Sequence, residues 1–515
     1  MTEEEVLLRI EDLKTYFHTY EGVVKALEGI NIDVRKGETM GLVGETGCGK
    51  SVTALTVMGL IPSPPGKVES GGVFLGEPAK VTALRKEYDK EFKKSPQDRQ
   101  KEIDSIEKQI EALVGEANKP KRMELRDRLA ALTRSYDLIT KSQTELNEVR
   151  GARMSMVFQE PMTALNPAYT IGDQIGETLE LHQLDKLIED VLKQLELEMK
   201  AFEARKVARR NKKELAEFAA ATAITDMKST REVEVCSICG TRTREDWRAC
   251  VGCGARLSPK LPRPVRKMFY RIALRYYNSM KENPQNSWAY FVKSNPVTIK
   301  LQRRLKLAKT IRAEDALRDV KIAEPGRIVR SYPFELSGGM KQRAMIAMMM
   351  SCQPELLIAD EPTTALDVTV EAQILALMRE LQMTKNTSIL LITHDLGVIA
   401  EVTNRVAVMY AGYVAELSTT KEIFARPTHP YTHALLRSIP KIGLSHMKER
   451  KKPLYVIPGI VPNLLKPPPG CRFHPRCERA LEVCKRVMPD LIEHVPGHFV
   501  ACHNPVPFGP EVKRS

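Results

Sequence analysis

No stretch of this 515-residue chain holds the roughly 20 consecutive apolar residues that a helix needs to cross a bilayer. The N-terminus, MTEEEVLLRI, also lacks the basic segment and apolar core of a secretory signal. Both absences predict a cytosolic protein that is soluble or bound to a membrane surface, where structural disulfides are not expected. At about 150 residues per domain, the length predicts about three domains.

Acidic residues are scarce in one segment only. The formal net charge is +14, from 79 Lys and Arg against 65 Asp and Glu. Residues 183–310 hold 28 basic and 14 acidic residues, and within them residues 254–310 hold 14 basic residues against the single acid Glu282. The basicity of the protein is therefore concentrated in one segment, and the rest of the chain is not basic.

A phosphate-binding loop is predicted near the N-terminus. The apolar strand 40–43 leads into GETGCGKS, residues 44–51, and then into a helical stretch. The glycines let backbone N–H groups surround phosphates, Lys50 reaches the β- and γ-phosphate oxygens, and the Ser51 hydroxyl ligates Mg²⁺. The glycines of this loop are Gly44, Gly47 and Gly49. The chain is therefore expected to bind ATP with Mg²⁺.

A later apolar strand ends in two adjacent carboxylates. Residues 356–361 read LLIADE, so that the apolar run stops at Asp360 and Glu361. The first carboxylate suits Mg²⁺, and the second suits a general base for an attacking water molecule. The alternative is a buried strand followed by an acidic turn, but the phosphate-binding loop upstream favours the catalytic interpretation.

Two further motifs complete the set, LSGGMKQR at 336–343 and LLITHD at 390–395. In order and spacing these motifs resemble the ATP-binding subunit of ABC transporters. The resemblance implies an ATPase whose site is composite, because neither the phosphate-binding face nor the signature face surrounds the nucleotide alone. It also implies a second ATP-binding subunit and two transmembrane permease subunits as partners.

The resemblance assigns a role to each matching residue. Gln159, in MVFQEPMTALNP, matches the Q-loop that senses γ-phosphate and Mg²⁺, Asp367 matches the D-loop, and His394 matches the switch histidine. The signature that closes over the ATP of the opposite subunit is matched by Ser337, Gly338 and Gly339. The Mg²⁺ ligands it implies are Ser51, Gln159 and Asp360. An aromatic ring that stacks on adenine is expected upstream of the loop, with Phe17 as first choice and Tyr20 as second.

The C-terminal region narrows the resemblance. After HPYTHALL the chain reads PGIVPNLLKPPPGCRFHPRC, similar to the ATP-binding subunits of oligopeptide and dipeptide importers of the D/F type, in which a Cys-rich tail follows. Some members carry an iron-sulfur cluster there. Four thiolates of this tail are enough for one [4Fe-4S] cluster, with zinc as the competing interpretation and a set of buried free thiols as a third: Cys471, Cys477, Cys484 and Cys502.

That narrower resemblance has implications for partners and location. It implies a heterodimer with a sister subunit of the F type, together with an extracellular substrate-binding protein. The cargo it implies is a dipeptide or oligopeptide, with oligosaccharides or metal chelates also compatible. The chain would then be a peripheral protein on the cytoplasmic side of the cell membrane.

Two insertions separate the motifs. In the first, apolar residues recur at helical spacing on both sides of a turn near 115–120, which predicts an antiparallel helical hairpin over 81–144. The alternative is one solvated amphipathic helix folded onto the domain. The apolar positions are Ile103, Ile106, Ile110, Leu113, Leu125, Leu129, Leu132, Tyr136 and Ile139.

The second insertion, 183–312, carries two CxxC-Gly knuckles. Each points two thiolates at one ion, and together they predict a structural Zn²⁺ site in a ribbon at 232–256, with a redox-active CxxC pair as the alternative. The four ligands are Cys236, Cys239, Cys250 and Cys253.

The basic segment 254–310 also holds seven aromatic residues. This combination favours a surface that meets anionic lipid or the permease, with nucleic acid as a second possibility and a small structural core as a third. The aromatic residues are Phe269, Tyr270, Tyr276, Tyr277, Trp288, Tyr290 and Phe291.

The expected fold is an α/β, ABC-type P-loop nucleotide-binding domain with an antiparallel β subdomain and a helical subdomain, a helical-hairpin and a zinc-ribbon insertion, and a Cys-rich C-terminal module. The expected boundaries are 1–80, 145–182 and 313–430 for the nucleotide-binding domain, 81–144 for the hairpin, 183–312 for the second insertion with its basic aromatic part at 257–310, and 431–515 for the Cys-rich module.

The function expected is energy coupling in a peptide-class importer. The competing hypothesis is a soluble ABC ATPase that acts on nucleic acid, since some of those proteins also carry coiled-coil and zinc insertions.

Overall fold

The computed structural model describes residues 5–91, 96–113, 119–159, 164–208, 233–235, 242–244, 263–282, 299–364, 366–439 and 455–507. The chain divides into two compact units. One consists of residues 1–160 with 353–515, and the other of residues 161–352. None of the helices that the structure describes is long and apolar enough to cross a membrane.

The first unit contains a three-stranded antiparallel sheet in the order β2-β1-β4. Apolar and polar residues alternate along β1, so one face of the sheet turns inward, with Leu8, Ile10 and Leu13 fully buried. The strands are β1 (Val6–Thr19), β2 (Gly22–Arg35) and β4 (Gly66–Leu75).

The second sheet of this unit has eight strands in the order β12-β13-β11-β10-β3-β9-β8-β5. Its central strands, from β10 to β5, pair in parallel and are buried throughout, which is why their sequences are almost continuously apolar. The strands are β3 (Thr39–Val43), β5 (Met154–Val157), β8 (Leu356–Asp360), β9 (Ser388–Thr393), β10 (Arg405–Tyr410), β11 (Tyr413–Thr419), β12 (Ile492–Val495) and β13 (His498–Val500).

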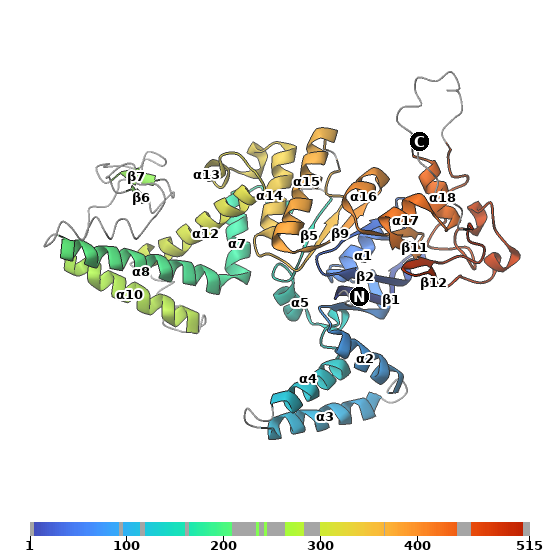
Figure 1. The fold of residues 1–515 in the computed structure, drawn as a ribbon, viewed down its shortest axis with the longest axis horizontal. Helices are drawn as coiled ribbons and strands as arrows, with labels where there is room; N and C mark the ends of the chain where they lie inside the picture. Colours follow the sequence, from blue (N-terminus) through green and yellow to red (C-terminus); the bar gives the residue numbers. More distant parts are fainter. Residues whose placement is uncertain are drawn as a thin grey trace, which may run out of the picture. The chain divides into compact units, whose positions relative to one another are not determined.

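The parallel register determines where the motifs lie. Val43 pairs with Thr393, and Asp360 pairs with Ile392, so β3, β8 and β9 end together. The carboxyl edge of a parallel sheet is where ligands bind in open α/β folds. Helices of this unit (Figure 1) are α1 (Lys50–Val57), α5 (Gln143–Val149), α15 (Val368–Lys385), α16 (Leu396–Val402), α17 (Thr420–Ala425) and α18 (Pro430–Arg437), with the short turn η3 (Leu138–Thr140).

The first insertion forms three helices that stand apart from the sheets in Figure 1: α2 (Ala79–Glu91), α3 (Pro96–Ala112) and α4 (Lys119–Thr133). Helix α4 packs against both α2 and α3. The predicted stripes meet in a small core in which Ile106, Leu125 and Leu132 are buried, with Val81 and Tyr88 added from α2. Helix α2 was not predicted, because it has few apolar positions. Ile139 was predicted to belong to the second apolar stripe of the hairpin, but it packs against the main core of the first unit.

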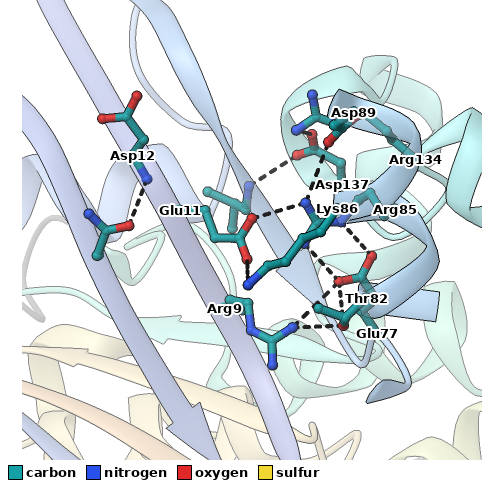
Figure 2. A network of polar contacts seen from close by, with 12 residues as sticks. Arg9, Glu11, Asp12, Glu77, Thr82, Arg85, Lys86, Asp89, Arg134 and Asp137 are labelled. Carbon is teal, nitrogen blue, oxygen red and sulfur yellow. Dashed lines mark hydrogen bonds and ion pairs between the residues drawn. The ribbon is translucent and has the colours of Figure 1, made fainter. Parts of the chain in front are cut away.

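A buried arginine joins this insertion to the antiparallel sheet (Figure 2). Arg85 of α2 is 2% exposed, and its guanidinium makes two bonds to Glu77, at 2.8 and 3.1 Å, and one to Glu11 of β1 at 2.9 Å. It also stacks 3.7 Å from the ring centroid of Phe74 in β4. Asp137, beyond α4, accepts the Val73 N–H at 3.0 Å. Polar contacts thus fix both ends of the insertion to the sheet.

The second unit is mainly helical. Helix α12 packs on α7, α8 and α14, and α10 packs on α8. Its elements are α7 (Ile171–His182), α8 (Leu184–Ala208), α10 (Arg263–Glu282), α12 (Ile299–Asp319), α13 (Pro325–Ile328), η5 (Pro333–Glu335) and α14 (Gly338–Met350), with a pair of short strands, β6 (Val233–Val235) and β7 (Arg242–Arg244).

The expectation that the aromatic residues of segment 254–310 form an exposed surface is wrong for three of them. Tyr270, Tyr276 and Tyr277 of α10 are 6%, 3% and 0% exposed, and Tyr276 and Tyr277 meet edge to face at 5.0 Å. Rings buried in this way form a core and cannot stack on bases or enter a lipid interface. The side chain of Phe269, together with Trp288, Tyr290 and Phe291, lies outside what the structure describes.

The Cys-rich region continues the first unit. Short turns η7 (His474–Arg476) and η8 (Glu482–Lys485) precede β12 and β13, and β13 pairs with β11, so the region extends the eight-stranded sheet. Phe473 is buried in a cluster with Tyr410 and Tyr431, at 5.1 and 5.4 Å between ring centroids. The C-terminal region is therefore packed against the core of the first unit.

Candidate functional site

The phosphate-binding loop connects β3 to α1. Gly49 has a φ of 103°, a conformation that favours glycine, and it caps α1, which begins at Lys50. Gly44 has no room for a side chain, since an added Cβ would lie 2.2 Å from the Met409 carbonyl oxygen. The Lys50 ammonium donates to the carbonyls of Gly44 and Glu45 at 2.8 and 3.1 Å. Its charge is therefore held within the loop where phosphates are expected.

A hydroxyl and a carboxylate meet beside this loop. The Ser51 Oγ donates to the Asp360 Oδ1 at 3.2 Å, although 309 residues separate them. Burial raises the pKa of Asp360, and the neighbouring Glu361 raises it further, while Ser51 lowers it. A buried carboxylate with a raised pKa gains from a cation that compensates its charge. Both groups are oxygen donors that suit Mg²⁺.

Glu361 lies at the centre of a set of hydrogen bonds. It has a φ of 45°, which turns the chain directly after β8. Gln159 Nε2 donates to its Oε2 at 2.8 Å, Thr364 Oγ1 donates to the same oxygen at 3.0 Å, and His394 Nδ1 lies 2.9 Å from its Oε1. Burial alone raises its pKa, but the hydrogen bonds from His394 and Thr364 hold the pKa below the usual range. Glu361 is therefore an ionised carboxylate that can accept a proton.

These residues form one polar edge of the sheet. The phosphate-binding loop follows β3, Ser51 and Asp360 form a pair suited to a cation, and the ionised carboxylate of Glu361 follows β8. Asp360 is buried and Glu361 half-buried, so the acid nearest the loop is the one withdrawn from water. A phosphate bound to the loop would lie close to both. The geometry suits attack of a water molecule on a phosphoryl group.

The remaining predicted residues lie elsewhere. Phe17 is half-buried on β1, where it pairs with Val24, and Tyr20 is fully exposed in the turn between β1 and β2. Asp367 caps α15 by accepting the Val370 N–H at 2.9 Å. Ser337, in the second unit, caps α14, so that Gly338 and Gly339 begin the helix.

The predicted zinc ligands lie outside the described residues. The tail cysteines are described: Cys471, Cys477, Cys484 and Cys502 are free thiols that line one small cavity. Within the ranges that the structure describes, no group of three or more His, Cys, Asp or Glu residues is arranged to hold a metal ion.

The tail thiols share a low-polarity environment. Burial raises the pKa of Cys471 to about 11 and of Cys502 to about 12, and it also raises the pKa of Cys477. The neighbouring thiols contribute in the same direction. Cys471, Cys477 and Cys502 are therefore protonated at neutral pH, so metal binding by these three thiols would release protons.

Sequence patterns alone missed two contacts. Thr364 stands three residues after Glu361, and only the turn made by the positive φ of Glu361 brings its hydroxyl back to the carboxylate. Arg476 lies in the Cys-rich tail, yet its guanidinium bonds to Glu45 of the phosphate-binding loop. Its position beside Cys477 is the only signal that the sequence offers for it.

Comparisons with known families match this chain in two regions. The model of the family described as ABC transporter matches residues 27–217 and 261–364, and so omits the part that contains the four CxxC cysteines. The model described as the oligopeptide/dipeptide transporter C-terminal region matches residues 415–484.

Curated proteins match nearly the whole chain. A probable peptide ABC transporter ATP-binding protein of Sinorhizobium fredii is 32% identical over 97% of this chain and 95% of its own length. The dipeptide transport ATP-binding protein DppD of Bacillus subtilis is 32% identical over 97% of this chain and 94% of its own. Among solved structures, a dimeric ATP-binding cassette with ADP and phosphate is 14% identical, covers 80% of this chain and 99% of its own, and has a TM-score of 0.40.

Proposed function

The chain belongs to the family of ATP-binding subunits of ABC-type peptide importers, and from that premise we propose that it hydrolyses ATP to drive import of dipeptides or oligopeptides. The observation that carries the proposal is the carboxylate of Glu361, which is held by Gln159 and His394 at the edge where the phosphate-binding loop lies. Glu361 acts as the general base for water, and His394 orients it.

ATP and Mg²⁺ occupy the same edge in this proposal. The loop N–H groups and Lys50 hold the β- and γ-phosphates, and Mg²⁺ is ligated by Ser51, Asp360 and Gln159. The existing Ser51–Asp360 contact supports this assignment, because the two groups already meet where the cation would lie. Phe17 is the proposed adenine contact.

A second subunit completes the site. Ser337, Gly338 and Gly339 stand at the N-terminus of α14, where backbone N–H groups favour an anion, and we assign them to the ATP bound by the partner subunit. The partner is an F-type sister subunit. Two permease subunits and an extracellular substrate-binding protein complete the importer, which places this chain on the cytoplasmic side of the membrane.

The C-terminal thiols fit a metal centre in the chemistry of their donors. Four soft sulfur ligands line one cavity, and such a set selects zinc or an iron-sulfur cluster. We assign a [4Fe-4S] cluster to Cys471, Cys477, Cys484 and Cys502, where it would tie the tail together. A structural Zn²⁺ at Cys236, Cys239, Cys250 and Cys253 remains a proposal from spacing alone.

The competing hypothesis of an ATPase acting on nucleic acid finds no support. The names of the relatives refer to peptide transport, and the three tyrosines of α10 that are described are buried. Contact of segment 254–310 with anionic lipid likewise has no support from those rings. Because the names of the relatives refer to peptide and dipeptide transport, peptide is the cargo class that we propose.

The decisive experiment is transport by the reconstituted importer. Vesicles containing this chain, its sister subunit and both permeases should hydrolyse ATP faster when a peptide-loaded binding protein is added. Uptake of labelled peptide should depend on Glu361. Hydrolysis that responds to nucleic acid and not to the loaded binding protein would contradict the proposal.

A further inference from the structure

The C-terminal region reaches the phosphate-binding loop through one arginine. The Arg476 guanidinium holds the Glu45 carboxylate at two points, with Nη1 at 2.8 Å from Oε2 and Nη2 at 3.2 Å from Oε1. Arg476 is 8% exposed, and 431 residues separate it from Glu45. A bidentate pair with a buried arginine constrains geometry far more than an exposed surface pair does.

Arg476 is itself held firmly. Its Nε donates to the Pro458 carbonyl at 2.9 Å, and its Nη1 donates to the Tyr410 hydroxyl at 3.2 Å. An additional bond from Nη2 to the Ile457 carbonyl spans 3.4 Å. The position of the guanidinium is therefore set by the tail and by β10, independently of its bonds to Glu45.

The backbone of Glu45 is held from the same side. Its N–H donates to the hydroxyl of Tyr431, a fully buried residue of α18, at 3.1 Å. Its carbonyl accepts from Lys50 Nζ at 3.1 Å and from the Cys48 N–H at 3.2 Å. The residue that the tail holds is thus one of the two whose carbonyls accept from the phosphate-binding lysine, the other being Gly44.

We propose that Arg476 is a positioning residue of the nucleotide site: through Glu45 it keeps the phosphate-binding loop in its binding conformation. A loop containing three glycines has large conformational freedom, which would be lost when its N–H groups close around phosphates. Because the Glu45 carboxylate is held from outside the loop, the loop has less conformational entropy to lose when it binds phosphates, so nucleotide binds more tightly. This inference rests on the proposed ATP binding.

A purely structural role makes a different prediction. If Arg476 only fastened the tail to the core, its loss would lower thermal stability and leave the affinity of the folded protein for nucleotide unchanged. Glu45 helps to separate the two roles, because it belongs to the loop and not to the tail, so that Glu45→Gln leaves the bonds of Arg476 to Pro458 and Tyr410 in place. Glu45→Gln is accordingly the sharper variant, and Arg476→Met is the second.

The test is calorimetric titration of the full-length chain with MgADP, which avoids hydrolysis. Glu45→Gln and Arg476→Met should each weaken binding by about 10-fold, because nucleotide would then bear more of the entropic cost of ordering the loop. Arg476→Lys, which keeps the charge but not the two-point geometry, should recover part of the affinity. The double variant should bind no more weakly than Arg476→Met alone, since both changes remove one interaction. In the assembled transporter the loss should appear in KM rather than kcat.

Arg479→Met provides the matched control. Arg479 lies in the same tail but bonds to Asn504 and to the Pro505 carbonyl, not to the loop. It should leave MgADP affinity unchanged. MgADP binding by both Glu45→Gln and Arg476→Met within twofold of wild type would overturn the inference, as would an equal weakening by Arg479→Met. A wild-type chain that failed to bind MgADP would instead overturn the proposed ATPase function, and this inference with it.

Discussion

The side-chain amide of Gln159 donates a hydrogen bond to the Glu361 carboxylate at 2.8 Å, across 202 residues of sequence. The other carboxylate oxygen faces His394 Nδ1 at 2.9 Å. Both oxygens of the proposed base therefore have hydrogen-bond partners within the protein. Gln159 is also a proposed Mg²⁺ ligand, and if its side-chain oxygen turned to that ion its N–H would leave Oε2 of Glu361. That oxygen would then keep only the Thr364 hydrogen bond and could accept a proton from water.

Replacement of Glu361 by Gln should abolish turnover and spare nucleotide binding. The amide keeps the shape of the side chain but cannot accept a proton from water, and loss of a catalytic base costs about 10²-fold or more in kcat. Two quantities are measured for each variant: the rate of ATP hydrolysis by the assembled transporter, and the affinity for MgATP. Lys50→Ala should do the reverse and weaken binding itself. Near-normal hydrolysis by the Gln variant would exclude Glu361 as the base.

Thr364 should tune the same carboxylate. Thr364→Val removes a hydrogen bond that stabilises the ionised form, so the pKa of Glu361 should rise and the acid limb of the kcat–pH profile should move to higher pH. Activity at pH 7 should fall by less than ~10-fold, because the carboxylate stays ionised there. Thr364→Ser keeps the hydroxyl and should retain the wild-type profile. Coincident profiles for the Val and Ser variants would show that Thr364 has no such effect.

Motifs in the sequence predicted the nucleotide edge because each one sits where a parallel strand ends. Lys50 and His394 follow β3 and β9, and Asp360 ends β8; parallel strands bring such residues to one edge whatever their separation in the sequence. Contacts made by side chains from irregular segments were not predictable in this way. No periodicity leads from Arg476 in a short turn to Glu45, and only the packing of the tail on β10 creates that pair.

In the first insertion, too, the sequence predicted the helices but not the polar contacts of irregular geometry. Apolar spacing predicted the helices that contain Ile106 and Leu125, since a packed stripe leaves a period of 3.6 in the sequence. The polar anchor was not visible, because Arg85 and Glu77 look like ordinary surface residues until they are buried together. Charge in a sequence does not by itself reveal burial.

Arg85→Met should destabilise the first insertion. It would leave Glu77, which is 7% exposed, without its main partner, and breaking a buried pair costs about 3–5 kcal/mol. Limited proteolysis should then cut within 81–144, while MgADP binding at the distant loop persists. Arg128→Met, which removes a more exposed arginine bonded to Glu102 and to the Tyr88 hydroxyl in the same insertion, should destabilise it less than Arg85→Met does. Equal protease resistance of the Arg85 variant and the wild type would contradict this role.

Acid should destabilise the first unit through His429. Burial lowers the pKa of this histidine from 6.5 to about 4, and its Nδ1 accepts the Tyr431 N–H, a bond that requires the neutral ring. Between pH 6.5 and 4 the unfolded chain binds the extra proton, so stability falls as the pH is lowered, by up to about 3 kcal/mol. His429→Asn should flatten the pH dependence of the thermal midpoint over this range. An unchanged slope would place the acid sensitivity elsewhere.

The C-terminal thiols give the last test. Protein purified without oxygen should be brown, with broad visible absorbance, and should contain iron in addition to about one zinc per chain. Cys477→Ser removes one of four thiols that line the same cavity, so iron should be lost and zinc retained, because the zinc ligands lie in a separate insertion. Cys352→Ser is the control, since this buried thiol belongs to the helical unit and touches Ser351 and the Thr178 carbonyl. Elemental analysis that found two zinc ions and no iron would instead make the tail a second zinc site, because four thiolates serve either metal.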